Sequence, residues 1–386
     1  MDMRVPYDLR RKNNYHMKIA IEAQRIFRKN KHGMDFVACE IIKQLQRIDT
    51  ENQYYIIVAP GEDVCIKETS NFRIIVVKCP TYPLWEQVAL PLAVKRIKPD
   101  ILHCTSNTAP IFCKTPLVIT LHDIIYLEKR QSSSKSIYQN MGWYYRRFVV
   151  PRILPKCRKI ITVSQFECER IKDALHIDSS RILAIYNGFG EYFKPVRNFL
   201  NTTNKYFSAE SWLFFLGNTD PKKNTLRTLK AYEIYVKQTE KPLPLVIADL
   251  NESIVDQLLN DNGLTSLKPL LISPGYIVNI DLPAIYSGAK IFLYTSLRES
   301  FGIPLLEAMA CGTPVITSNT SSMPEVAGEG AILINPFDEN EIAKMILKLE
   351  ADDELYNKQV VYGLDRVKSF SWTKTAISTL EVYKSI

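Results

Sequence analysis

The chain has 386 residues, of which 46% are hydrophobic and 23% charged, and its formal net charge is +8 at pH 7. These values are ordinary for a globular protein, and the length favours two domains. None of the eight cysteines forms a C-x-x-C pair, which argues against a structural zinc site and against a disulfide framework. Because the sequence shows no apolar leader and no long uncharged run, we expect a cytoplasmic protein without a membrane span.

The positive charge is concentrated in two segments. Residues 1–32 carry nine Lys or Arg against three Asp or Glu, and residues 129–172 carry eleven against two. Such an excess indicates an anionic partner, but no nucleic-acid-binding motif accompanies it, so nucleic acid is not expected. Aromatic residues such as Trp143 and Phe148 interleave with arginines, which favours peripheral contact of 129–172 with an anionic membrane. The alternative is a core helix with a solvent-exposed arginine face.

The first regular pattern begins near Met17, after a patternless stretch, residues 1–16, that we expect to be a disordered arm. Short β-branched runs with polar ends then recur, as is typical of buried parallel strands. A loop around Gly33 and an amphipathic helix over 38–48 separate the first two runs. The predicted strands of this N-terminal domain, residues 17–197, are 18–23, 53–59, 72–78, 100–105, 116–123, 159–164 and 181–188.

A polar, Asn/Thr-rich stretch, residues 198–207, is the predicted linker. In the domain predicted beyond it, residues 208–369, a second series of strands alternates with helical patterns such as 225–238. Two successive series of this kind indicate an α/β protein with two doubly wound, Rossmann-like domains and parallel sheets. Ligands of such sheets bind at the carboxyl ends of the strands, so a central cleft is the expected site. The strands predicted here are 211–218, 243–249, 267–277, 290–296, 313–319 and 330–336.

The common nucleotide-binding and metal-binding motifs are missing from the sequence. No G-x-G-x-x-G follows the first strand, and neither a P-loop nor a D-x-D is present. No cluster of His, Cys and carboxylate residues has metal-ligand spacing either. A bound phosphate would have to be neutralised by basic side chains and helix amino termini, so no metal or other cofactor is expected.

The stretch from Arg298 to Ile316 places two glutamates, Glu299 and Glu307, around a loop that passes into a helix. Pro304 suits a first helical turn, and the small residues before it leave backbone amides open to an anion. Carboxylates repel phosphate, so the two glutamates are expected to accept hydrogen bonds from hydroxyl groups at either end of a ligand. A sugar at one end and a ribose at the other satisfy this pattern.

Two glutamates with seven residues between them, followed by AMACGTPVI, resemble the signature of the family 4 retaining glycosyltransferases, which have the GT-B fold. The resemblance covers nearly the whole chain. GNTDPKKN at 217–224 is similar to the family's phosphate-binding loop, and TLHD at 120–123 to a strand end that reaches its cleft. Residues 370–386 resemble a closing helix that packs back on the N-terminal domain. The resemblance therefore implies two Rossmann-like domains that face a central cleft.

This resemblance implies that a nucleotide sugar lies on the C-terminal domain. Glu307 would hold the ribose hydroxyls, Glu299 would contact the sugar, and Lys223 would neutralise the leaving diphosphate. His122 would hydrogen-bond the donor sugar. Many family members have an arginine where this chain has Asn218, and Lys222 is expected to substitute for it. The implied catalytic residues are His122, Glu299 and Lys223, and the implied donor-binding residues are Gly33, Gly217, Asn218, Lys222, Lys223, Glu299, Phe301, Gly302, Ile303 and Glu307.

The implied activity is hexosyl transfer from a nucleotide sugar to a glycan or lipid-linked oligosaccharide in surface polysaccharide synthesis, with retention at the anomeric carbon by front-face attack. The segment from Leu84 to Gln87, with Leu90 and Pro91, resembles that of mannosyltransferases. GDP-mannose is therefore the first donor expected and a UDP-hexose the second. One alternative is a sugar-nucleotide epimerase of the same fold, against which the glutamate pair argues. Another is a two-lobed sugar-binding protein, against which the lysines of PKKN and the missing export signal argue.

Overall fold

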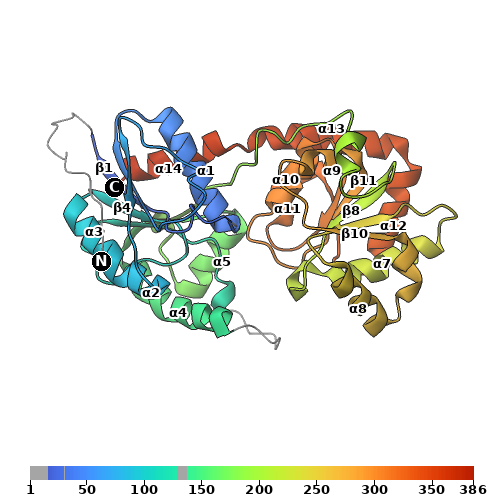
Figure 1. Cartoon of the computed structure of the whole chain (residues 1–386), viewed down its shortest axis with the longest axis horizontal. Coiled ribbons are helices and arrows are strands. Elements are labelled where there is room, and N and C mark those ends of the chain that lie inside the picture. The colour runs from blue at the N-terminus through green and yellow to red at the C-terminus, as the bar shows by residue number, and fades with distance from the viewer. Residues whose placement is uncertain (1–15, 30, 128–136) are drawn as a thin grey trace. The chain divides into compact units, whose positions relative to one another are not determined.

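A computed structural model describes residues 16–29, 31–127 and 137–386 of the chain. The chain divides into two compact units (Figure 1). Unit 1 comprises Met1–Asn187 together with Trp372–Ile386, and unit 2 comprises Gly188–Ser371. The arm predicted at the amino terminus lies outside the described residues except for His16.

In the described part of unit 1, seven parallel strands form one sheet in the order β3-β2-β1-β4-β5-β6-β7. The order reverses between β1 and β4, which are neighbours in the sheet but not in the chain. A reversal of this kind defines a doubly wound sheet and opens a crevice at the carboxyl ends of the two strands. The strands are β1 (Lys18–Glu22), β2 (Gln53–Val58), β3 (Phe72–Val76), β4 (Ile101–Cys104), β5 (Leu117–Thr120), β6 (Cys157–Thr162) and β7 (Ile182–Ala184).

Helices cover both faces of this sheet (Figure 1). On one face α1 (Gly33–Ile48) packs against α14 (Trp372–Lys384), where the ring of Phe36 meets that of Trp372 edge-on at 5.9 Å. The loop predicted around Gly33 is instead the first turn of α1, because the Asp35 carboxylate caps this turn by accepting the His32 N–H at 3.1 Å.

The other face of the sheet packs on α3 (Leu90–Ile97), α4 (Ile137–Ile153) and α5 (Gln165–Leu175) through one apolar core. Shorter helical turns complete the unit, including a π-helical turn, η1, that leads into α3. These turns are α2 (Tyr82–Leu84), η1 (Trp85–Ala89), η2 (Ile125–Leu127), η3 (Leu154–Lys156) and η4 (Ser179–Arg181).

In unit 2, six parallel strands form a second sheet in the order β10-β9-β8-β11-β12-β13, and the order reverses between β8 and β11. Both sheets confirm the predicted α/β class with two doubly wound domains. The strands are β8 (Trp212–Leu216), β9 (Leu245–Ala248), β10 (Leu271–Gly275), β11 (Ala289–Tyr294), β12 (Val315–Ser318) and β13 (Ile332–Ile334).

The helices of unit 2 also lie on both faces of their sheet. The core on one face is formed with α7 (Thr225–Lys237), α8 (Glu252–Asn262) and α12 (Glu339–Ala351). The remaining elements are α6 (Leu200–Thr203), η5 (Pro221–Lys223), η6 (Thr265–Leu270), α9 (Leu282–Gly288), α10 (Ile303–Ala310), α11 (Met323–Ala327), η7 (Gly328–Gly330), α13 (Asp353–Arg366) and η8 (Val367–Ser369).

The boundary between the units falls earlier than the sequence suggested. Residues 188–197, which were assigned to the N-terminal domain, belong to unit 2, and 198–207 do not act as a free linker. Phe199 and Phe207 pack edge-on against the ring of Trp212, with centroids 5.7 and 5.0 Å away. These aromatic contacts attach the polar segment to unit 2.

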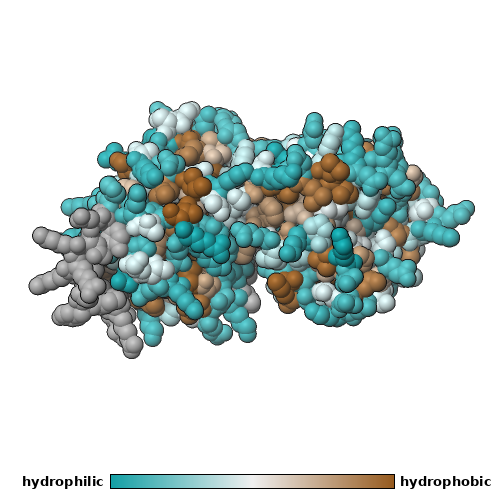
Figure 2. Space-filling view, turned by 90° about the horizontal axis from the view of Figure 1, so that it is seen from above, coloured by the Kyte–Doolittle hydropathy of each residue, from teal (hydrophilic) through white to brown (hydrophobic). Residues whose placement is uncertain are grey.

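No helix among the described residues is long and apolar enough to cross a membrane. On the face shown in Figure 2, hydrophilic residues predominate and interrupt the hydrophobic patches. Scattered exposed apolar side chains of this kind are normal for a folded protein.

Candidate functional site

Two loops meet where the strand order of unit 2 reverses. One follows β8 and runs from Gly217 to Asn224, and the other follows β11 and runs from Thr295 to Gly302. The N–H of Leu297 in the second loop donates to the main-chain oxygen of Lys222 in the first at 2.7 Å. Open parallel sheets bind ligands at such a topological switch point, where the strand order reverses. The two stretches singled out in the sequence therefore share one edge of one sheet.

The loop after β8 is shaped by its first two residues. A Cβ on Gly217 would lie 2.6 Å from a side-chain atom of Leu250 and 2.7 Å from one of Ile247, so only glycine fits here. The main-chain oxygen of Asn218 accepts a hydrogen bond from Thr225 Oγ1 at 2.6 Å. The Asn218 side-chain oxygen accepts the N–H two residues further on, at 2.9 Å. Asn218 therefore contributes to the shape of the loop.

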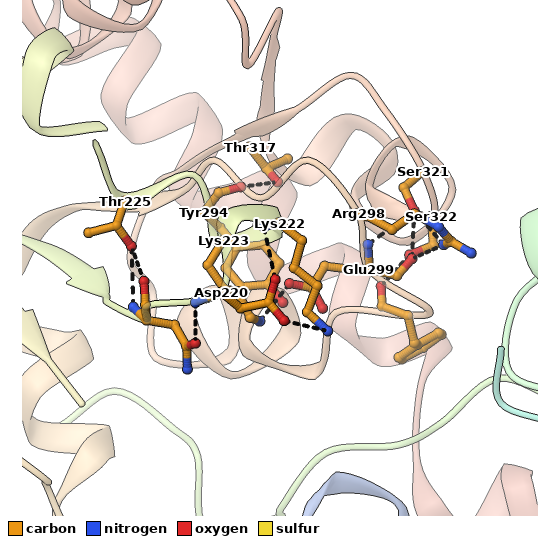
Figure 3. Close-up of polar contacts among 12 residues, drawn as sticks. Asp220, Lys222, Lys223, Thr225, Tyr294, Arg298, Glu299, Thr317, Ser321 and Ser322 are labelled. Carbon is orange, nitrogen blue, oxygen red and sulfur yellow. Dashed lines mark hydrogen bonds and ion pairs between the residues drawn. The ribbon is translucent and has the colours of Figure 1, made fainter. Parts of the chain in front are cut away.

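The two lysines of PKKN lie in the turn η5, which Asp220 caps by accepting the Lys222 N–H at 3.1 Å. The Nζ of Lys222 lies 3.9 Å from the Asp220 carboxylate. Lys223 Nζ donates to Glu299 Oε1 at 2.6 Å and lies 5.6 Å from the centroid of the Tyr294 ring (Figure 3). The Lys223 and Glu299 side chains are 25% and 14% exposed. The Lys223–Glu299 pair is thus partly shielded from water but still accessible to a ligand.

Two serines that the sequence analysis missed fix the main chain of Glu299 (Figure 3). Ser321 Oγ donates to the Glu299 oxygen at 2.6 Å and accepts the Glu299 N–H at 3.1 Å. Ser322 Oγ lies 3.0 Å from the main-chain oxygens of both Glu299 and Phe301. The signal in the sequence is a small polar pair before Met-Pro at the start of α11, but nothing local connects that pair to a loop more than twenty residues away.

The helix α10 begins at the same edge of the sheet. Gly302, just before it, has a φ of +103°, which residues with a Cβ rarely adopt. Pro304 stands in the first turn, where a missing N–H costs nothing. Pro304 has no N–H and the Leu305 N–H donates to the main-chain oxygen of Gly302 at 3.0 Å, so in this turn it is the amide of Ile303 that suits an anion. The Phe301 side chain is buried against Phe370 and is therefore not accessible to a ligand.

Glu307 lies one turn inside α10, among helix residues that are mostly buried and apolar. The Tyr286 hydroxyl donates to Glu307 Oε2 at 3.4 Å. Burial raises the pKa of Glu307 to about 7, and this hydrogen bond opposes the rise only in part. A poorly solvated carboxylate is stabilised by further hydroxyl donors. Glu307 is therefore suited to the two hydroxyls of a ribose.

In unit 1, His122 follows β5 and is 6% exposed. Its main-chain N–H donates to Asn107 Oδ1 at 2.6 Å, and its ring Nε2 lies 3.0 Å from the main-chain oxygen of Thr105. Burial lowers the pKa of His122, and the hydrogen bond to Thr105 and the Asp123 and Asp35 carboxylates oppose this shift only in part. His122 is therefore uncharged at neutral pH.

Gly33 begins α1 in the same unit, and no atom lies within 4 Å of the position its Cβ would take. The carboxylate of Asp35, in the first turn of α1, is one of the groups that raise the pKa of His122. In the described residues, no group of three or more His, Cys, Asp or Glu could hold a metal ion. The predicted residues that gather at the edge of unit 2 are Gly217, Asn218, Lys222, Lys223, Glu299, Phe301, Gly302, Ile303 and Glu307.

Mannosyltransferases are among the known relatives that match substantial parts of the chain. O-antigen chain mannosyltransferase B of Escherichia coli is 30% identical over 237 residues, which cover 60% of this chain and 61% of that protein. Serotype-specific mannosyltransferase WbdA of Escherichia coli is 28% identical over 320 residues, which cover 76% of this chain and 38% of that protein. The chain thus spans less than two thirds of the length of these relatives.

The fold has a close counterpart among solved structures. Sucrose-phosphate synthase from Thermosynechococcus elongatus superposes with a TM-score of 0.74 at 19% identity, covering 95% of this chain and 98% of that one. Models of two protein families also match: glycosyltransferase family 4 over residues 32–189, and glycosyl transferases group 1 over residues 203–366. The two matches cover both units, and the chain therefore belongs to the family 4 glycosyltransferases of the GT-B fold.

Proposed function

We propose that this protein is a retaining hexosyltransferase of the cytoplasm that moves a sugar from a nucleotide donor to a glycan or lipid-linked glycan during surface polysaccharide synthesis. The observation that carries the proposal is the Lys223–Glu299 pair beside the amino terminus of α10. The cation and the positive end of the helix, with the Ile303 amide, suit a diphosphate, and the carboxylate suits sugar hydroxyls. The mannosyltransferases among the relatives support mannose as the sugar, with GDP-mannose as the first donor and a UDP-hexose as the second.

The basic groups of unit 2 suit a leaving group that becomes more negative as the glycosidic bond breaks. Lys223, Lys222 and the first turn of α10 supply the positive potential, so we expect donor binding without a divalent metal. Because the charge develops in the transition state, these groups favour catalysis over ground-state binding. In this scheme Glu307 holds the ribose, and Glu299 holds the sugar hydroxyls.

The reaction itself is a single displacement on the face of the departing diphosphate. The acceptor hydroxyl attacks the anomeric carbon while the bond to the phosphate oxygen breaks, and a phosphate oxygen takes the hydroxyl proton. We infer that His122, in its uncharged form, orients the sugar. No protein nucleophile is needed for retention on this route.

The outer face of α4 supports peripheral contact with an anionic membrane, which a lipid-linked acceptor would require. Met141, Tyr144 and Phe148 share one stripe of this helix and are 62%, 64% and 54% exposed. The Arg152 guanidinium lies 3.8 Å from the centroid of the Phe148 ring. Other α4 residues pack into the core of unit 1, so this helix has both a core face and an apolar, basic outer face. Residues 129–136 of the basic segment lie outside the described residues.

A thermal-shift series with GDP, UDP, ADP and their hexose conjugates, in the presence of EDTA, tests the donor site. Binding to the folded state raises the melting temperature with ligand concentration. We expect a selective rise with GDP-mannose, and a smaller one for the Glu307→Gln variant. If no nucleotide raises the melting temperature, the donor site is contradicted. Conversion of the free nucleotide sugar to an isomer without any acceptor would indicate the epimerase instead.

A further inference from the structure

His122 has a defined tautomer in the structure. Its Nε2 lies 3.0 Å from the main-chain oxygen of Thr105, and a carbonyl oxygen can only accept a hydrogen bond. Nε2 therefore carries the proton, and in a neutral ring Nδ1 carries a lone pair. No described residue forms a hydrogen bond with Nδ1. The ring thus keeps one acceptor nitrogen for a ligand.

Thr105 is in turn held by Glu22, the last residue of β1. The Thr105 N–H donates to Glu22 Oε2 at 3.3 Å, and Thr105 Oγ1 donates to the main-chain oxygen of Glu22 at 2.8 Å. The other carboxylate oxygen, Oε1, accepts the N–H of Gln24 at 3.0 Å. Glu22 is 1% exposed, so water does not compete for these bonds. Burial and the nearby Glu86 carboxylate raise the pKa of Glu22 to about 7, and the two N–H donors and the Arg25 charge oppose the rise.

The charged groups around the His122 ring do not change its protonation state. The hydrogen bond to Thr105 and the carboxylates of Asp123 and Asp35 favour a doubly protonated imidazolium, but burial opposes it more strongly and lowers the pKa of His122. The neighbouring ring of His103, whose pKa burial lowers to about 3, stays neutral. The neutral form with the proton on Nε2 is the one that satisfies the Thr105 oxygen.

We propose that Glu22 is a positioning residue for the transfer reaction: by fixing Thr105, it keeps His122 in the tautomer whose bare Nδ1 accepts a hydrogen bond from a hydroxyl of the bound sugar. The inference rests on the proposed function. An acceptor nitrogen matches a sugar hydroxyl, which donates, and does not match a phosphate oxygen, which only accepts. His122 therefore orients the sugar and does not protonate the leaving diphosphate.

Glu22→Gln is the variant that tests this chain of contacts. The side chain keeps its size but presents one carbonyl oxygen, so either the Thr105 N–H or the Gln24 N–H meets an amide NH₂ group. The backbone around Thr105 should then shift and weaken its hold on His122. The matched control is Asp49→Asn, which changes another buried carboxylate of unit 1, 3% exposed.

Asp49 accepts hydrogen bonds from Tyr54 and Asn52, and within the described residues no hydrogen bond joins it to Thr105. Its replacement should therefore lower stability without moving the His122 ring. This comparison separates a general loss of stability from a specific loss of positioning.

The readout is nitrogen NMR of the full chain labelled with nitrogen-15 at its five histidines, at a pH well above the Glu22 pKa of about 7 so that Glu22 is ionised, with His122→Asn to assign the signal. We expect wild-type His122 to be protonated at Nε2 alone, Glu22→Gln to show a mixture of tautomers, and Asp49→Asn to match the wild type. A wild-type ring protonated at Nδ1, or at both nitrogens, overturns the proposal. An unchanged ring in Glu22→Gln overturns it as well.

Activity adds a second readout. Glu22→Gln should lower kcat by about tenfold, because a displaced orienting group misplaces the reacting atoms, while nucleotide binding on unit 2 should stay as in the wild type. If this variant does not fold, Thr105→Val, which lacks the Oγ1 bond to the main-chain oxygen of Glu22, should show the same tautomer mixture. If the protein proves to have no transferase activity, the NMR result still stands, so failure of the proposed function and failure of this inference are distinguishable.

Discussion

Replacing Lys223 by glutamine tests whether its ion pair with Glu299 is part of the reaction or only a link between two loops. The variant removes a cation 2.6 Å from Glu299 Oε1 and leaves a carboxylate that is 14% exposed without that partner. Losing one partner of a fully buried pair costs about 3–5 kcal/mol, and an exposed pair is worth about 0–1 kcal/mol. Because the pair is only partly buried, we expect the free energy of unfolding to fall by about 1–2 kcal/mol.

The loss of activity should exceed the loss of stability. Removing one group that stabilises developing charge costs about 2.7–4 kcal/mol, or about 10²–10³ in kcat. The rate is measured as release of the nucleoside diphosphate at saturating donor, and stability by urea unfolding at the same pH. A double-mutant cycle with Glu299→Gln then gives the coupling between the two side chains in each quantity.

Lys237→Gln is the matched control for this experiment. Lys237 lies in α7 of the same unit and pairs with Glu233 at 2.8 Å, but its side chain is 66% exposed. We expect its unfolding free energy to change by about 0.5 kcal/mol at most, and its kcat to stay the same. If Lys223→Gln keeps kcat within about threefold of the wild type, the reasoning is refuted, because the ion pair is then structural only.

Glu307→Gln should weaken nucleotide binding and change the pH dependence of stability. Burial raises the folded-state pKa of Glu307 to about 7 from an ordinary 4.5, so the folded state binds the extra proton and wild-type stability falls as pH rises between these values. In urea unfolding, the free energy of unfolding of the variant, relative to that of the wild type, should therefore be higher at pH 8 than at pH 5. The same difference between variant and wild type at both pH values would contradict this. Gly302→Ala places a Cβ at a φ of +103° and should cost about 1–2 kcal/mol in urea unfolding, whereas Gly142→Ala, where the Cβ meets no atom within 4 Å, should not destabilise. On α4, the pair Tyr144→Ser and Phe148→Ser should reduce cosedimentation with anionic vesicles several-fold at unchanged melting temperature, and equal binding of variant and wild type would exclude this stripe as the membrane contact.

The strands of both sheets and the fold class could be predicted from the sequence because the relevant signals are local. A buried parallel strand is a short β-branched run with polar ends, whatever it later pairs with. The start of α10 is equally local, since Gly302, Pro304 and Glu307 lie within one short stretch. The sequence by itself therefore determined which loops and which helix start carry the candidate site.

Only the tertiary structure decided which distant groups complete that site. Ser321 and Glu299, which are hydrogen-bonded, lie 22 positions apart in the chain. Glu22 and Thr105, also hydrogen-bonded, lie 83 positions apart. The boundary at Gly188 likewise depends on aromatic packing against Trp212, which overrides the polar composition of the segment. The reason is physical: hydrogen bonds and ring contacts form between groups that strand order and helix packing bring together, and neither is encoded in any single stretch of sequence.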